Sequence, residues 1–167
     1  MKTICYHFLD KSKWPRRGEW DDEPDKVQWQ DQATRLPCLA VRNRFLGFWC
    51  GYVGVDELHP YFERLADQIP TDIRVHGGIT YASACLDDVC HVVEPGENDR
   101  VWWLGFDCCH GGDQTPARPI SVARWHYRSL AYVQRQCAEL AAQLAKIHAF
   151  TRQSTGFDSP ADGPGAA

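Results

Sequence analysis

An apolar and aromatic run, Val101 to Phe106, breaks abruptly into a loop dense in Asp, Cys, His and Gly. The run Val-Trp-Trp-Leu-Gly-Phe is typical of a buried strand, because strands inside a core read as short continuous apolar stretches. The polar loop, Asp107 to Asp113, therefore starts where a buried strand ends. This junction predicts a core that contains a sheet and delivers polar side chains to one place.

Further strands are predicted earlier in the chain. Residues 38–43 and 48–55 are apolar and separated by a turn, which predicts a hairpin. Residues 71–81 predict another strand, and the pair Gly77-Gly78 within it indicates a bulge, a sharp bend or the close approach of another backbone or a ligand. Between these strands, Pro60 and the helical spacing of Phe62, Leu65 and Ile69 predict a short helix over residues 61–68.

The strongest helical pattern runs from Ser129 to His148, where apolar residues recur every three to four positions and form one stripe. That stripe must be buried, and a sheet is the expected partner. The sequence therefore predicts an α+β fold, with an antiparallel sheet of four to five strands packed against one long C-terminal helix.

A length of 167 residues is typical of one domain. Residues 1–37 combine prolines and charges without a sustained period, so they are predicted to form an irregular N-terminal arm whose tryptophans pin it to the body. Residues 38–150 are expected to form the single α+β domain. Residues 151–167, rich in Ser, Gly, Pro and Ala, are predicted to be a disordered tail.

The net charge of −4 and the absence of a long basic block make nucleic acid an unlikely partner. No stretch approaches the roughly 18 apolar residues of a membrane span, and the first residues lack the apolar core of a secretory signal. These observations predict a cytoplasmic protein. On that basis the eight cysteines are expected to be thiols rather than a disulfide framework.

The loop after the aromatic strand offers a candidate catalytic set. Asp107, His110 and Asp113 follow a D-x-x-H-x-x-D spacing, and His76 would join them if its strand lies beside Val101–Phe106. Carboxylate and imidazole groups together can hold a divalent metal, which would be the cofactor and would lower the pKa of a bound water. The alternative is that Asp107 caps a turn, Asp113 hydrogen-bonds the loop backbone, and His110 is a packed or surface histidine.

Other residues are candidates for ligand binding around the same cleft. Glu57 and His59 would act as base or ligand, although Glu57 could simply begin the short helix while His59 packs beside its proline. Gly77 and Gly78 resemble the glycine-rich oxyanion loops of serine esterases, yet no G-x-S-x-G accompanies them. Tyr81 and Trp103, with other aromatic residues, would wall a pocket or anchor an interface.

Cysteine chemistry is the remaining alternative. Cys85, Cys90, Cys108 and Cys109 lie near His91 and His110, but they lack the paired C-x-x-C spacing of structural zinc sites. Buried reduced cysteines are the simpler interpretation. A nucleophilic cysteine beside His110 or His76 stays open on sequence grounds.

Four motifs carry a resemblance to a known group of proteins: Glu23 to Trp29, Gly51 to Pro60, Val75 to Tyr81, and Trp103 to Asp113. In these motifs the chain resembles small uncharacterised proteins encoded by bacteriophages and prophages, over roughly residues 18 to 145. The resemblance implies a viral or prophage setting and assigns no catalytic role. It also implies that an accessory role on host physiology or defence competes with catalysis.

Two functional hypotheses follow. The first is a small metal-dependent hydrolase that uses His76, Asp107, His110 and Asp113. The second is a non-enzymatic binding protein that sequesters a small molecule or inhibits a host protein. The sequence leaves the reaction, the partner and the oligomeric state open.

Overall fold

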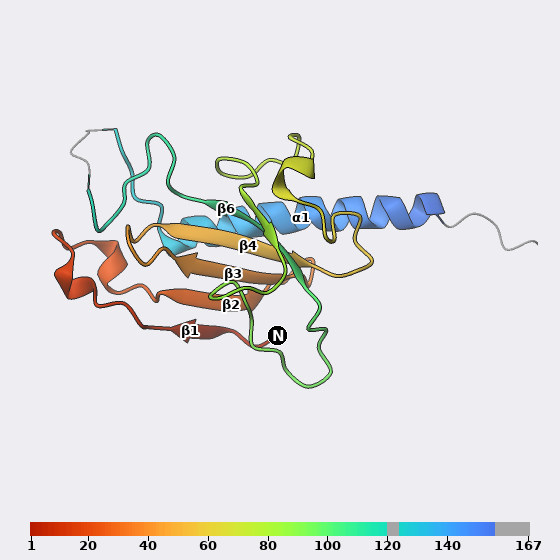
Figure 1. Ribbon diagram of the computed structural model, residues 1–167, viewed down its shortest axis with the longest axis horizontal. Helices are drawn as coiled ribbons and strands as arrows, with labels where there is room; N and C mark the ends of the chain where they lie inside the picture. The colour runs from red at the N-terminus through yellow and green to blue at the C-terminus, as the bar shows by residue number, and fades with distance from the viewer. Residues whose placement is uncertain (120–123, 156–167) are drawn as a thin grey trace, which may run out of the picture.

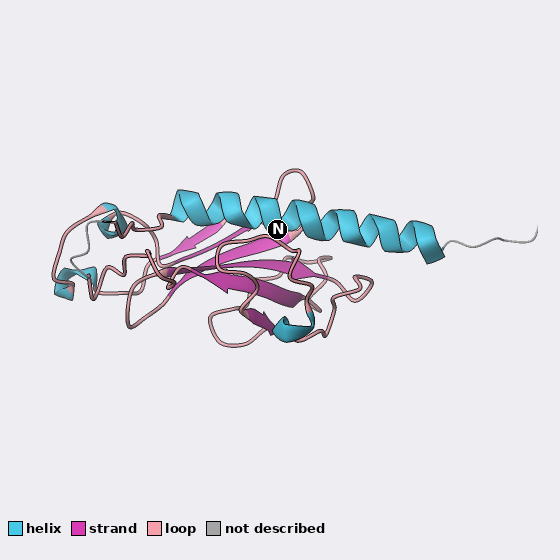
Figure 2. Ribbon diagram, turned by 90° about the horizontal axis from the view of Figure 1, so that it is seen from above, coloured by secondary structure: helices cyan, strands magenta, loops and turns pink. Residues whose placement is uncertain are grey.

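In residues 1–119 and 124–155, which the computed structural model describes, one six-stranded antiparallel sheet packs against one long helix (Figures 1 and 2). The strand order is β1-β2-β3-β4-β6-β5. The predicted α+β class, antiparallel sheet and C-terminal helix are thus confirmed, and the sheet is larger than predicted. The elements are β1 (Ile4–Tyr6), β2 (Lys26–Gln30), β3 (Pro37–Arg42), β4 (Trp49–Val55), β5 (Tyr81–Ser83), β6 (Trp102–Asp107) and α1 (Leu130–Thr155).

Helix α1 lies along one face of the sheet and buries its apolar stripe there (Figure 2). Alternate residues of β3, such as Cys38 and Ala40, point to this face because successive side chains of a strand point to opposite sides. Gly51 in β4 allows the helix to come close, since a Cβ there would lie 2.9 Å from Cys137 Sγ on α1. From α1 this core receives Val133, Cys137, Leu140, Ala141 and Leu144.

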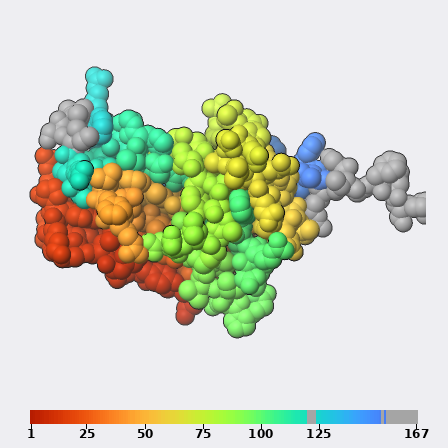
Figure 3. Space-filling view, viewed as in Figure 1, coloured from red at the N-terminus to blue at the C-terminus, as the bar shows by residue number. Residues whose placement is uncertain are grey.

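The opposite face of the sheet is covered by chain segments rather than by a helix (Figure 3). Leu39, Tyr52 and Trp103 form its core together with Val89 and Val101, which lie in the long segment between β5 and β6. Buried Gln28 of β2 accepts a hydrogen bond from the Val92 N–H at 2.9 Å and donates one to the Val92 carbonyl. Because both faces are buried, β3 and β4 read as almost continuous apolar runs.

The same segment contains a disulfide between Cys85 and Cys90, whose Cα atoms are 4.7 Å apart. The expectation that all cysteines are thiols is therefore wrong for this pair. The two residues close a short loop, and such local pairing carries no spacing signature that the sequence could reveal. The free cysteines are Cys5, Cys38, Cys50, Cys108, Cys109 and Cys137.

The extra strands come from residues 1–37, which are not irregular throughout. Strand β2 pairs with β3, and β1 pairs with the outer edge of β2. The pattern of β2, Lys-Val-Gln-Trp-Gln, does alternate, with Val27 and Trp29 on one face. Gln28 on the other face is also buried, and because it is polar the strand lacks the continuous apolar run of β3 and β4. The tryptophans do tie the arm down, since Trp20 is buried and packs edge-on against Tyr127 at 5.1 Å.

Three local predictions differ from the structure. The predicted helix over 61–68 is a series of turns ending in a 3-10 turn, Ala66–Gln68. The predicted strand over 71–81 is mostly loop, because positive φ angles at Gly77 and Gly78 turn the chain, and pairing starts with β5. Helix α1 continues to Thr155, past residue 150, so the first part of the predicted tail is helical, and residues 156–167 lie outside the described residues.

A buried ion network joins the N-terminal arm, the sheet and the start of α1. Arg42 is fully buried, and its guanidinium donates to Glu23 Oε2 at 2.7 Å and to the Gly47 carbonyl at 2.7 Å. The same Glu23 oxygen accepts from Trp49 Nε1 at 3.0 Å and from the Tyr127 hydroxyl. Its other oxygen, Oε1, accepts from the Leu130 N–H at 2.7 Å, where α1 begins.

Among the described residues, no helix combines the length and the hydropathy that crossing a bilayer requires. Helix α1 is 26 residues long, but it has an exposed polar face and a buried apolar stripe.

Removing the Glu23 charge should destabilise the fold strongly. Glu23→Gln leaves the buried Arg42 guanidinium without its closest counter-ion, and breaking such a pair costs about 3–5 kcal/mol. Urea denaturation should show that loss in the free energy of unfolding. Glu57→Gln is the matched control, because it breaks the exposed Glu57–Arg100 pair (2.7 Å) and should cost less than about 1 kcal/mol. Similar small losses in both variants would contradict the assignment.

Candidate functional site

The candidate site lies at the end of the sheet where β6 stops and α1 begins. The loop after β6, teal in Figure 1, runs past the first turns of α1. Its start is held by the Cys108 N–H, which donates to the Trp49 carbonyl at 2.9 Å, and its end by Asp113, which forms a bridge with His126. The segment that contains His76 and Gly77 also reaches this end of the sheet. It is held against α1 by the His76 N–H, which donates to Gln136 Oε1 at 2.8 Å.

Asp113 is the centre of the site and is only 2% exposed. Its Oδ1 accepts from Arg128 Nε at 2.7 Å, and its Oδ2 accepts from the His110 N–H at 3.0 Å and lies 2.7 Å from His76 Nε2. Burial alone would raise the pKa of Asp113, but Arg128 and the other donors hold that pKa below its usual value. Asp113 is therefore an ionised carboxylate whose two oxygens are both occupied.

His76 is fixed between two elements. Because Asp113 is ionised, His76 Nε2 carries a proton and donates it to Asp113 Oδ2. The other ring nitrogen, Nδ1, lies 2.8 Å from the Tyr132 hydroxyl of α1 and accepts from it when the ring is neutral. A carboxylate, an imidazole and a phenol thus form a continuous chain, in which His76 has no free nitrogen.

Asp107 and His110 form a second and looser pair. Asp107 is held by the Thr80 hydroxyl at 2.9 Å and by the Cys109 N–H at 3.0 Å. His110 Nε2 lies 3.5 Å from Asp107 Oδ1, beyond a normal hydrogen bond, and this nitrogen is buried. The His110 and His76 rings are 5.5 Å apart, so the two histidine–carboxylate pairs are neighbours.

Gly77 is required for this arrangement. Its φ is +68°, and a Cβ on it would lie 1.9 Å from His110 Nε2. The His110 ring therefore packs directly on the Gly77 backbone, a position that no other residue type allows. Gly78, with φ +85° and nothing within 4 Å of a Cβ, serves the turn alone. The glycine pair forms a bend, which is one of the predicted alternatives, and the group that lies close to Gly77 is the His110 side chain rather than a backbone or a ligand.

A cavity of about 470 Å³ opens beside His110. It lies between the loop after β6 and the β3–β4 hairpin, which meet where the Ala117 N–H donates to the Leu46 carbonyl at 3.1 Å. In Figure 3 these two segments, teal and orange, lie side by side. The side chains that line the cavity come from Leu46, Cys109, His110, Asp113, Thr115, Arg118 and Trp125.

The four predicted catalytic residues His76, Asp107, His110 and Asp113 therefore do come together, but not as metal ligands. In the described part of the chain, no group of three or more His, Cys, Asp or Glu side chains could hold a metal ion. Both carboxylates are already occupied by N–H and O–H donors, and the Arg128 guanidinium would repel a cation at Asp113. The donor set does not fit a divalent metal.

The cysteines near the site are not activated. Burial raises the pKa of the Cys108 thiol, and the neighbouring Asp113 adds to the rise. Burial and Asp107 also raise the pKa of Cys109. Nucleophilic cysteines have a lowered pKa, which neither residue shows.

Two predicted ligand-binding residues lie elsewhere. Glu57 is exposed and pairs with Arg100. His59 is 4% exposed, its Nε2 donates to the Leu144 carbonyl at 3.0 Å, and its Nδ1 accepts from the Tyr61 N–H. Burial lowers the pKa of His59, which is a neutral packed histidine against α1.

The aromatic residues do not wall one pocket. Trp49 and Trp103 are fully buried and lie in cores on opposite faces of the sheet. Tyr81 packs against the second core, edge-on to Tyr52 at 5.1 Å. Tyr81 and Trp103 therefore lie outside the cavity beside His110.

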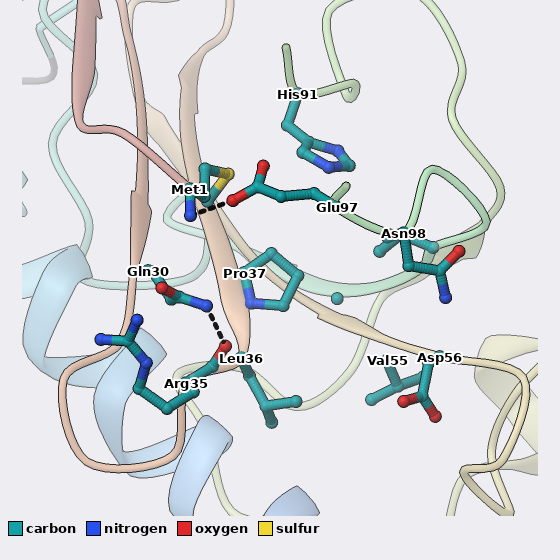
Figure 4. Close-up of a pocket in the computed structure, with 12 residues that line it drawn as sticks. Met1, Gln30, Arg35, Leu36, Pro37, Val55, Asp56, His91, Glu97 and Asn98 are labelled. Carbon is teal, nitrogen blue, oxygen red and sulfur yellow. Dashed lines mark hydrogen bonds and ion pairs between the residues drawn. The ribbon is translucent and has the colours of Figure 1, made fainter. Parts of the chain in front are cut away.

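A second cavity of about 280 Å³ lies at the other end of the sheet, between β3, β4 and the segment before β6 (Figure 4). Met1 and Glu97 pair at its upper rim, and Gln30 Nε2 donates to the Arg35 carbonyl at 2.8 Å below. His91 stands over this rim, and burial lowers its pKa. None of the predicted catalytic residues lines this cavity.

The sequence missed residues that complete the site. Arg128 lies just before α1 and Tyr132 lies in its first turn; neither residue stood out as functional in the sequence. Thr80, Arg118 and Trp125 come from irregular segments. Their positions depend on tertiary contacts across many residues, which no local spacing encodes.

Comparisons of the chain with protein-family models, curated proteins and solved structures gave no match. The interpretation of the site therefore rests on its geometry.

Gly77→Ala should disturb the site more than Gly78→Ala. Both variants place a side chain at a positive φ, which costs about 1 kcal/mol or more, but only Gly77→Ala also pushes against the His110 ring. We expect a larger loss of unfolding free energy in Gly77→Ala and a displaced His110 imidazole signal by NMR. An unchanged His110 signal in Gly77→Ala would refute the contact, and Gly78→Ala controls for backbone strain.

Proposed function

We propose that the protein is a small hydrolase in which His110 is the general base and Asp107 orients it. The observation that carries the proposal is the position of His110. Its imidazole lines the cavity, its Nε2 faces Asp107, and its Nδ1 makes no hydrogen bond within the described residues. A base oriented by a carboxylate beside a cavity is the arrangement from which hydrolytic enzymes activate a nucleophile.

The reaction can be written with these groups alone. His110 Nδ1 accepts a proton from a water molecule as that water attacks an ester or phosphoester bond. Asp107 stabilises the imidazolium, and His110 returns the proton to the leaving oxygen. The 3.5 Å separation from Asp107 would shorten as His110 gains charge, since catalytic hydrogen bonds are often long without substrate.

His76 and Asp113 act as positioning residues. Asp113 accepts the His110 N–H and so fixes the loop that carries the base. His76 ties Asp113 to Tyr132, and Arg128 keeps Asp113 ionised. The buried network thus supports a rigid frame beneath the exposed imidazole, which is 36% exposed.

The resemblance to phage and prophage proteins supports a setting in an infected host cell, with the cytoplasm as the proposed location. A binding protein that sequesters a ligand in the same cavity is the alternative function. It is favoured by the fact that His76 and both carboxylates are fully hydrogen bonded, as in a static scaffold.

The test is an activity screen with chromogenic phosphomonoesters, phosphodiesters and carboxyl esters. His110→Gln should lower the rate on the accepted class about 10²–10⁴-fold, as expected for loss of a general base. Asp107→Asn should lower kcat with a smaller effect, and EDTA should have none. His126→Gln is the matched control, because this exposed histidine lies in the segment between β6 and α1 but does not line the cavity.

Three outcomes would contradict the proposal. A rate that His110→Gln leaves unchanged would remove His110 from catalysis. Activity lost on chelation would restore the metal-dependent prediction. Folded protein that hydrolyses none of the three classes, while still binding a ligand, would favour the binding function.

A further inference from the structure

We propose that the cavity beside His110 binds a molecule that combines a planar aromatic ring with an anionic group, as a nucleoside monophosphate does. This inference rests on the same cavity as the proposed function and names its substrate class. Two side chains on the cavity wall carry it: Arg118 for the anion and Trp125 for the ring.

The backbone around Arg118 is held in place by hydrogen bonds. Its carbonyl accepts from the Thr115 hydroxyl at 3.0 Å, and the Ala117 N–H beside it donates to Leu46. Its guanidinium has no acidic partner among the described residues. Arg42, Arg100 and Arg128, in contrast, are each paired with a carboxylate. An unpaired guanidinium at a cavity wall suits a phosphate or carboxylate, which it can bind with two parallel hydrogen bonds.

Trp125 is a half-buried tryptophan without an aromatic partner in the described part of the chain. Other tryptophans have partners within the protein: Trp20 packs against Tyr127, and Trp49 Nε1 donates to Glu23. An indole ring on the wall of a cavity, near the apolar Leu46, offers a surface on which a flat ring can stack.

The electrostatics of the cavity permit an anion. Asp113 is the acidic residue that lines the cavity, and it is 2% exposed and bonded to Arg128 and His76. Its charge is therefore compensated before a ligand binds. The volume of about 470 Å³ lies within the range of about 300–1,000 Å³ typical of small-molecule sites. His110 lines the same cavity, so a bound molecule would contact the proposed base.

Isothermal titration calorimetry with AMP, CMP, adenosine and inorganic phosphate as probes tests this assignment on the full chain. Wild-type protein should bind the two monophosphates more tightly than adenosine or phosphate. Arg118→Gln should weaken AMP about tenfold or more and leave adenosine unchanged. Trp125→Leu should weaken AMP and adenosine alike by about tenfold, and Trp125→Phe should restore much of the affinity.

Arg124→Gln is the matched control, since this exposed arginine lies near Trp125 but does not line the cavity. It should bind all probes as the wild type does. Equal losses in Arg118→Gln and Arg124→Gln, or absence of binding by the folded wild type, would overturn the inference.

The two proposals can fail separately. Calorimetry measures binding and the ester screen measures hydrolysis, both on the wild-type protein, so each proposal has its own readout. Binding without hydrolysis of any ester would defeat the hydrolase and leave this inference standing. Hydrolysis by a protein that binds none of these probes would defeat this inference alone.

Discussion

The carboxylate of Glu23 is the interaction on which the rest of the structure depends. It compensates the fully buried Arg42 and accepts from Trp49, Tyr127 and the N–H of Leu130. These partners belong to the sheet and to the start of α1, while Glu23 itself belongs to the N-terminal arm. A buried charge is costly unless its partners are in place, so the network forms as a unit and specifies where the helix begins.

The beginning of α1 in turn determines the site. Arg128 precedes the helix and reaches Asp113, whereas Tyr132 lies in its first turns and reaches His76. If the helix shifted along the sheet, Arg128 would move away from Asp113 and Tyr132 would move away from His76. The residues of the candidate site are thus assembled by the same contact that joins the arm to the core. His110 differs from the others, because it is more exposed and loosely paired, which fits its proposed role as the base.

The sequence predicted those parts of the molecule in which the local pattern and the tertiary environment agree. The β3–β4 hairpin, β6 and the stripe of α1 are apolar where they are buried, and the loop after β6 did bring Asp107, His110 and Asp113 to one place. Strand β2 was missed because its buried residue Gln28 is polar. The Gln28 side chain is buried because it hydrogen-bonds the Val92 backbone in the loop above the strand. The metal was predicted from residue types alone, whereas the hydrogen bonds to Arg128 and Thr80 that occupy the carboxylates arise from the tertiary fold.

The central claim is that Asp113 and Asp107 fix the tautomers of His76 and His110, and that His110 Nδ1 makes no hydrogen bond within the described residues. Long-range ¹H–¹⁵N correlation NMR of histidine-labelled protein measures the tautomer of each ring directly. The account predicts the Nε2–H tautomer for both rings, with His76 Nδ1 shifted by the Tyr132 hydrogen bond and His110 Nδ1 unbonded. A His110 ring protonated on Nδ1 would contradict it.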